Sequence, residues 1–72
     1  PKDEYLLADI GGYYAALGMK EESLPLLAQA AALGPDIPQV LFQVAVGYEV
    51  LGRREDALAW LARAEATGYP TG

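Results

Sequence analysis

The sequence repeats itself after 34 residues, and this repeat restricts the possible folds more than any other feature of the chain. A shift of 34 positions aligns residues 4–37 with residues 38–71 without a gap. Identical pairs include Leu7 with Leu41, Tyr14 with Tyr48, Gly18 with Gly52, Leu24 with Leu58 and Leu27 with Leu61. A repeat of this length is one supersecondary unit that buries its apolar face only against its neighbours. Residues 1–72 are therefore expected to form a single domain of two such units.

The apolar residues of each unit have the spacing of two amphipathic helices with a glycine between them. In the first unit the apolar faces are formed by Leu6, Leu7, Ile10, Tyr13, Tyr14 and Leu17, and then by Leu24, Leu27, Ala28 and Ala31. In the second unit they are formed by Val40, Leu41, Val44, Tyr48 and Leu51, and then by Ala57, Leu58, Leu61 and Ala64. Gly18 and Gly52 are expected to end the first helix of each unit. Pro25 lies about one turn into a helix and predicts a mild kink or a late helix start.

The spacing of these residues resembles that of the tetratricopeptide repeat (TPR) family. The first unit has the pattern Leu7-x2-Ile10-Gly11-x2-Tyr14, Ser23-x3-Leu27, Ala30 and Pro35, and the second has Leu41-x2-Val44-Ala45-x2-Tyr48, Ala57-x3-Leu61 and Ala64. Leu7 and Leu41 stand where the family often has tryptophan, and Tyr69-Pro70 shifts the closing proline by one place. The resemblance implies an all-α fold, an α-solenoid fragment of two helix-turn-helix repeats with four antiparallel helices. No segment shows the alternation of a strand.

Two adjacent glycines, Gly11 and Gly12, lie inside the first predicted helix, where together they cost about 2 kcal/mol relative to alanines. In the TPR family the position of Gly11 marks the closest approach of the two helices of a repeat, and Ala45 is its small counterpart. Gly12 falls instead on the face that the resemblance implies is concave. It either leaves room for Phe42 to pack between the first helices of the two units, or it forms a shallow pocket for a bulky side chain of a partner.

The composition argues against an enzyme, a metal site and a bound cofactor. The chain has no histidine and no cysteine, so it lacks the commonest general base, the commonest metal ligand and any disulfide. Ser23 has no base beside it in the pattern and is expected to pack as a small residue. Asp3, Glu4 and Asp9 are expected to form a solvated acidic end rather than a cation site.

The remaining charged and aromatic residues have ordinary structural interpretations. Glu21-Glu22 and Glu55-Asp56 are expected to open helices, where negative charge suits the helix dipole. Lys20, Arg53 and Arg54 are expected to pair with surface acids. Tyr13, Tyr14 and Tyr48 are expected in the core between helices. Trp60, on the outer helix of the second unit, is expected either to pack in the interior or partly exposed on the convex side, or to contact a neighbouring segment that is missing here.

The net charge of −5 argues against binding to nucleic acid or to an anionic membrane, because both favour a basic patch. No apolar run approaches the ~20 residues of a membrane span. The absence of cysteine is compatible with a reducing compartment, and we expect a cytoplasmic protein.

The third predicted helix, residues 38–51, is apolar nearly all round. Phe42, Val46 and Val50 form a second stripe besides its core face, and such a helix is either covered or awaits a partner. The resemblance implies a concave, partner-binding groove that contains Tyr5, Asp9, Gly12, Ala16, Gln39, Phe42, Gln43, Val46, Glu49 and Val50. These residues include no basic side chain, so the carboxylate clamp of some TPR domains is absent. The expected ligand is an apolar or basic peptide or helix.

The sequence is compatible with two functions. The first is non-catalytic protein–protein recognition in the concave groove. The second is a structural spacer or a terminal segment of a longer TPR array, since the ending "ARAEATGYP" resembles terminal repeats of larger bacterial regulatory proteins. Leu58, Trp60 and Leu61 lie too close in sequence to face inward together. With the apolar stripe, they predict a homodimer or higher oligomer, most simply a two-fold pair.

Overall fold

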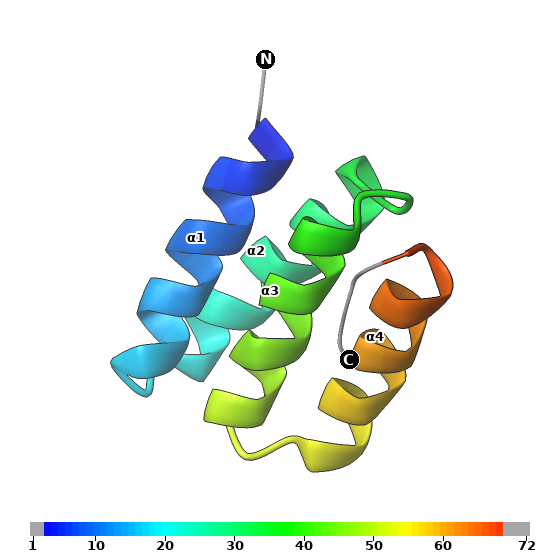
Figure 1. Cartoon of the computed structure of the whole chain (residues 1–72). Helices are drawn as coiled ribbons and strands as arrows, with labels where there is room; N and C mark the ends of the chain where they lie inside the picture. The colour runs from blue at the N-terminus through cyan, green and yellow to red at the C-terminus, as the bar shows by residue number, and fades with distance from the viewer. Residues whose placement is uncertain (1–2, 69–72) are drawn as a thin grey trace.

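The computed structural model describes residues 3–68, which form four α-helices and contain no strand (Figure 1). The helices are α1 (Asp3–Ala16), α2 (Lys20–Leu33), α3 (Pro38–Val50) and α4 (Arg54–Ala66). The first residues of α2 and α4 are Lys20 and Arg54, so these helices begin 34 residues apart. The predicted all-helical class is therefore confirmed, and the helix boundaries follow the repeat of the sequence.

The chain leaves α1 and α3 through the same glycine turn. Gly18 and Gly52 have φ values of +75° and +81°, a left-handed conformation that glycine adopts without a Cβ clash. The Met19 N–H donates to the Tyr14 carbonyl over 2.9 Å, and the Gly18 N–H donates to the Ala15 carbonyl over 2.9 Å. The same pair of bonds recurs around Gly52. This is the Schellman motif, and it confirms the predicted helix ends.

Helix α2 runs without interruption through Pro25, so a late helix start is wrong. Pro25 cannot donate a hydrogen bond to the carbonyl of Glu21. Both residues are exposed, so water can replace the missing donor. The acidic pairs Glu21-Glu22 and Glu55-Asp56 lie in the first turns of α2 and α4, as predicted.

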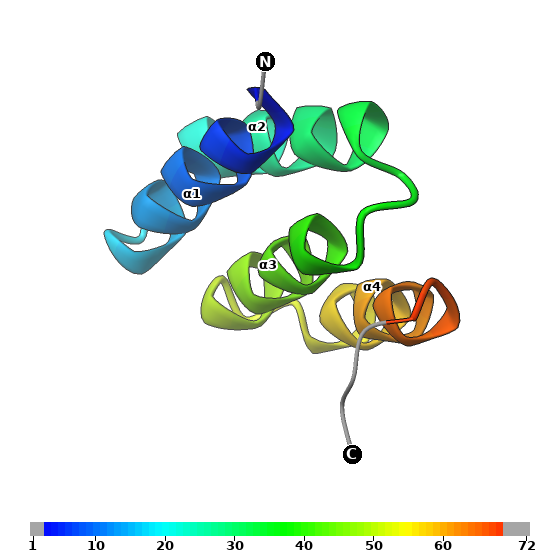
Figure 2. The ribbon, with the colours of Figure 1, turned by 45° about the horizontal axis from the view of Figure 1, so that its top comes forward.

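Helix α3 joins two helical pairs. Helices α1 and α2 pack against each other, and so do α3 and α4. Figure 2 shows one pair above the other. Helix α3 contacts both α1 and α2, whereas α4 contacts no other helix of the described chain than α3. The first pair therefore covers one side of α3, whereas α4 packs against α3 alone within residues 3–68.

Leu27 of α2 lies fully buried between two glycines, one on α1 and one on α3. A Cβ atom on Gly11 would lie 2.9 Å from Leu27 Cδ2 and 3.2 Å from the Leu27 backbone nitrogen. A Cβ atom on Gly47 would lie 2.7 Å from Leu27 Cδ1. Gly11 therefore marks the close approach that the sequence predicted. Gly47 was not predicted, because its counterpart in the first unit is Tyr13.

Ser23 ties α2 to α1 at the same crossing. Its fully buried hydroxyl donates a hydrogen bond of 2.6 Å to the carbonyl oxygen of Gly11. This bond satisfies a hydroxyl that would otherwise be buried without a partner. The predicted structural role of Ser23 is confirmed, and the equivalent position in the second unit is Ala57, which has no hydroxyl.

The predicted apolar face of α1 is confirmed only in part: Leu7 and Tyr14 are half-buried, and Leu7 packs against the core, but the other large residues are exposed. The buried residues of α1 are Ala8, Gly11 and Ala15. The exposed large residues of α1 include Leu6, Ile10 and Tyr13, of which Tyr13 is 64% exposed, and Leu17 in the following turn is also exposed. The reason is the close approach of α2 and α3, where α1 presents the small residues Ala8, Gly11 and Ala15.

The predicted core of the other helices is largely confirmed. Val40, Leu41 and Val44 of α3 are fully buried and cluster with residues of α2 and α4, namely Leu27, Ala30, Ala31 and Ala64. The exceptions are Ala28 and Leu58, which are exposed.

Two aromatic rings connect α3 to α4. Tyr48 stacks on Trp60 with ring centroids 6.3 Å apart and planes 7° apart, and both are half-buried against the core. The Arg63 guanidinium lies 4.6 Å from the centre of the Trp60 ring. The predicted packing of Trp60 and Tyr48 is confirmed. Tyr13 meets Tyr14 edge to face with ring centroids 6.1 Å apart; Tyr14 is half-buried, but Tyr13 is exposed, so the predicted core position of Tyr13 is wrong.

The adjacent glycines provide a matched test of this packing. Gly11→Ala should lower the free energy of unfolding by about 1–3 kcal/mol, because the new methyl group overpacks the crossing at Leu27. A Cβ on Gly12 would meet nothing within 4 Å, so the interpretation that Gly12 makes room for Phe42 is wrong. Gly12→Ala should leave stability unchanged or raise it by up to ~1 kcal/mol through helix propensity. Chemical denaturation measures both, and equal losses in the two variants would contradict this packing.

Candidate functional site

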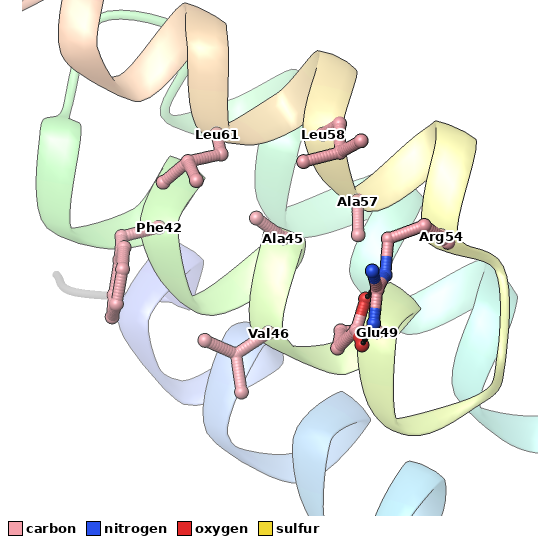
Figure 3. Close-up of a pocket in the computed structure, with 8 residues that line it drawn as sticks. All are labelled: Phe42, Ala45, Val46, Glu49, Arg54, Ala57, Leu58 and Leu61. Atoms are coloured by element: carbon pink, nitrogen blue, oxygen red, sulfur yellow. Dashed lines mark hydrogen bonds and ion pairs between the residues drawn. The ribbon is translucent and has the colours of Figure 1, made fainter.

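An apolar cleft lies between α3 and α4, and its lining residues are drawn in Figure 3. It is formed by Phe42, Ala45, Val46 and Glu49 of α3 and by Arg54, Ala57, Leu58 and Leu61 of α4. Its volume of about 270 Å³ is below the ~300–1,000 Å³ typical of small-molecule pockets. We call it the α3–α4 cleft. Its size suits one or two side chains of a protein better than a cofactor.

Helical spacing places these residues on facing sides of the two helices. On each helix the four lining residues lie at positions i, i+3, i+4 and i+7, which form one face. Ala45 and Ala57 are buried where the helices come close. The large side chains stand around them, and Leu58 is 57% exposed and Val46 45% exposed. The cleft is therefore a narrow apolar surface in contact with solvent.

An ion pair lies at one end of the cleft. The Arg54 guanidinium donates two hydrogen bonds to the Glu49 carboxylate, from Nε to Oε1 over 2.8 Å and from Nη2 to Oε2 over 2.7 Å (Figure 3). These bonds, followed by the positive charge of Arg54, lower the pKa of Glu49, and the same contact raises the pKa of Arg54. Both side chains are exposed, so the pair adds little to stability. Its main effect is to neutralise two charges beside an apolar surface.

The structure brings together three of the predicted groove residues, Phe42, Val46 and Glu49, as part of the α3–α4 cleft. The other seven lie outside this cleft: Tyr5, Asp9, Gly12 and Ala16 on α1, and Gln39, Gln43 and Val50 on α3. Gly12 is half-buried and the other six are exposed.

The half of the cleft that α4 contributes was not predicted as part of the site. The sequence does contain an indication of this half: Leu58, Trp60 and Leu61 cannot all face the core, so at least one of them must lie at a surface. Arg54 also belongs to the cleft, whereas the predicted groove had no basic residue. The predicted pairing of the arginines with acids is confirmed, and Arg53 contacts Asp56 at 2.8 Å.

The described residues offer little beyond apolar surface for chemistry. Within residues 3–68 no three acidic side chains lie where they could hold a metal ion. In the same range every buried side-chain nitrogen or oxygen has a hydrogen-bond partner. No helix of the described range combines the length and hydrophobicity that a membrane span requires. The α3–α4 cleft presents its apolar lining to solvent.

Comparison of the chain with protein-family models, with curated proteins and with solved structures finds no match. The function is therefore inferred from the α3–α4 cleft and from the internal repeat.

The ion pair gives a prediction for pH. Because the pKa of Glu49 is lowered in the folded chain, its contribution to stability is present above the usual pKa of glutamate and is lost as the pH falls through the lowered value. Arg54→Gln should move the pKa of Glu49 back towards its usual value. Arg53→Gln, which removes only the contact with Asp56, should leave the Glu49 pKa unchanged. Titration of the Glu49 side-chain carboxyl by NMR measures this, and an equal shift in both variants would contradict the assignment.

Proposed function

We propose that the chain is a non-catalytic protein-recognition module, built as a short TPR-like solenoid, and that the α3–α4 cleft is its binding site. The 34-residue repeat and its helix boundaries support the TPR-like assignment. The packing order supports it too: α3 contacts both helices of the first pair, whereas α4 contacts α3 alone among the described helices. Stacked pairs that touch only their neighbours are typical of solenoid repeats.

The observation that carries the proposal is the exposed apolar lining of the cleft. Val46 and Leu58 stand on opposite sides of it with large exposed fractions, and Phe42 and Leu61 are half-buried beside them. Apolar surface with a polar margin marks sites of protein interaction. A helix or an extended segment that presents bulky apolar side chains would fit this surface.

The charge of the chain narrows the class of partner. Arg54 lies at the cleft, but its charge is neutralised by Glu49. The net charge of −5 then attracts a partner with basic residues beside its apolar ones. The ligand class is therefore an apolar segment with positive flanks.

A designed cationic amphipathic peptide tests the proposal. Leu58→Asn should weaken its binding about tenfold or more, because a central apolar contact is lost. Leu33→Asn is the control, since Leu33 on α2 is also 57% exposed but does not line the cleft. Added salt should weaken binding, and an acidic peptide of the same apolar pattern should bind less tightly. NMR chemical-shift titration measures the peptide affinity in each of these comparisons. Equal weakening by the control, or tighter binding of the acidic peptide, would reject the cleft as the binding site.

The second candidate function is a structural segment of a longer TPR array. The specific observation in its favour is that the cleft residues occupy the same repeat positions as the surface of α1 and α2 against which α3 packs. In an array, the α3–α4 cleft would be covered by another helical pair. A segment of this kind would bind neither of the peptides above.

A further inference from the structure

The α3–α4 cleft has a filled counterpart in the first unit. Shifted by 34 positions, its lining corresponds to Ala8, Gly11, Gly12, Ala15, Ser23 and Leu27, besides Lys20 and Leu24. Five of these residues are buried, namely Ala8, Gly11, Ala15, Ser23 and Leu27, and Gly12 is half-buried. Helix α3 packs on both α1 and α2, with Gly47 against Leu27, and Ala8 clusters with Val40 and Val44 of α3. The cleft thus occupies the same repeat positions as the filled groove, and no helix within residues 3–68 lies across it.

Helix α1 is the counterpart of the helix that fills the first groove. Val40, Val44 and Gly47 of α3 are buried. The residues 34 positions earlier are Leu6, Ile10 and Tyr13 of α1, and all three are exposed. One chain therefore carries both an uncovered groove and the unburied face of a groove-filling helix.

We propose that the α3–α4 cleft binds α1 of a second copy of this chain, head to tail, with Leu6, Ile10 and Tyr13 in the cleft. This inference rests on the proposed function, because it names the partner of the same site. The contact would repeat the register of α3 on α1 and α2. A single interface of this kind would cover both exposed apolar surfaces, the cleft and the outer face of α1.

The side chains of the α3 wall of the cleft and of the exposed α1 face are larger than their counterparts at the filled groove of the first unit. The α3 wall of the cleft has Phe42, Val46 and Glu49 where α1 has the small residues Ala8, Gly12 and Ala15. These larger side chains keep an incoming helix further from the wall than α3 lies from α1. The incoming α1 has Tyr13 where α3 has Gly47, and its longer side chain reaches across the greater separation. Large side chains thus replace close backbone contact on both sides of the interface.

The geometry of this contact differs from the two-fold pair that the sequence predicted. Two different surfaces meet, so each copy in a pair still has one free cleft or one free α1 face. Such heterologous contacts extend into open arrays unless the rotation between copies closes a ring. Each copy carries a charge of −5, so salt should strengthen this self-association by screening repulsion, opposite to its effect on a cationic peptide.

Sedimentation of the full chain over a wide range of concentration tests the proposal with two single-surface variants. Tyr13→Asp alters the α1 face and Leu58→Asp alters the cleft, and both positions are exposed in the isolated chain. Leu33→Asp places the same charge at an exposed leucine of α2. The unaltered chain and Leu33→Asp should increase in average mass beyond the dimer, and each single-surface variant should remain monomeric. Thermal melts by circular dichroism establish that each variant is folded.

An equimolar mixture of Tyr13→Asp and Leu58→Asp gives the decisive result. One intact cleft and one intact α1 face remain in the mixture, so it should form a one-to-one pair that grows no further. A variant that still dimerises alone, together with a mixture that forms no pair, would indicate a two-fold contact and overturn the proposal. An unaltered chain that is monomeric at every concentration and salt also overturns it. If that monomer still binds the cationic peptide through Leu58, the proposed function stands, and if it does not, both fail.

Discussion

The contact of Leu27 with Gly11 and Gly47 determines how α1, α2 and α3 lie against one another. One leucine side chain from α2 fills the space over two glycines on different helices, and neither glycine could carry a Cβ without a clash. A glycine inside a helix costs roughly 0.5–1 kcal/mol relative to alanine. The close packing of a fully buried leucine offsets that cost. The position of α4 is then set by its packing on α3, through the stacking of Tyr48 on Trp60 and the burial of Ala64.

The same contact explains why so much apolar surface stays exposed. Because α2 and α3 come close to α1, the inner face of α1 is made of Ala8, Gly11 and Ala15. Its larger side chains Leu6, Ile10 and Tyr13 are exposed, and Leu7 is half-buried against the core. In the second unit Leu61 occupies the repeat position of Leu27 but is only half-buried, since no helix within residues 3–68 covers it. The surfaces proposed for binding are therefore consequences of how the core is built, and they come from the two sides of one repeated interface.

The helices and their ends were predictable from the sequence because they depend on local chemistry. The helical spacing and the glycines that form Schellman turns are read within a few residues, and the 34-residue repeat presents each of them twice. The core face of α3 was predictable for the same reason. The buried face of α1 was not, because both of its faces are apolar. The choice between them depends on how closely α2 and α3 approach, and that distance is set by Gly47, far away in the sequence.

The candidate site was predictable only in part, for a related reason. The stripe on α3 identified Phe42 and Val46 as apolar residues outside the main core face of the helix, and its period followed from one helix alone. Whether that stripe faces α1 or α4 depends on the tertiary arrangement, so Leu58, Leu61 and Arg54 were missed. The matching positions 34 residues earlier, which α3 fills, could have identified the cleft.

Solvent paramagnetic relaxation of the leucine methyl groups, measured by NMR on a dilute sample, tests the unequal covering of the two units most directly. Leu27 and Leu61 hold the same repeat position, so the comparison is made within one molecule. We expect the Leu27 methyl signals to be protected from a soluble paramagnetic probe and the Leu61 signals to be attenuated. Equal protection of the two leucines would contradict an open α3–α4 cleft, and attenuation of Leu27 would contradict its burial between the two glycines.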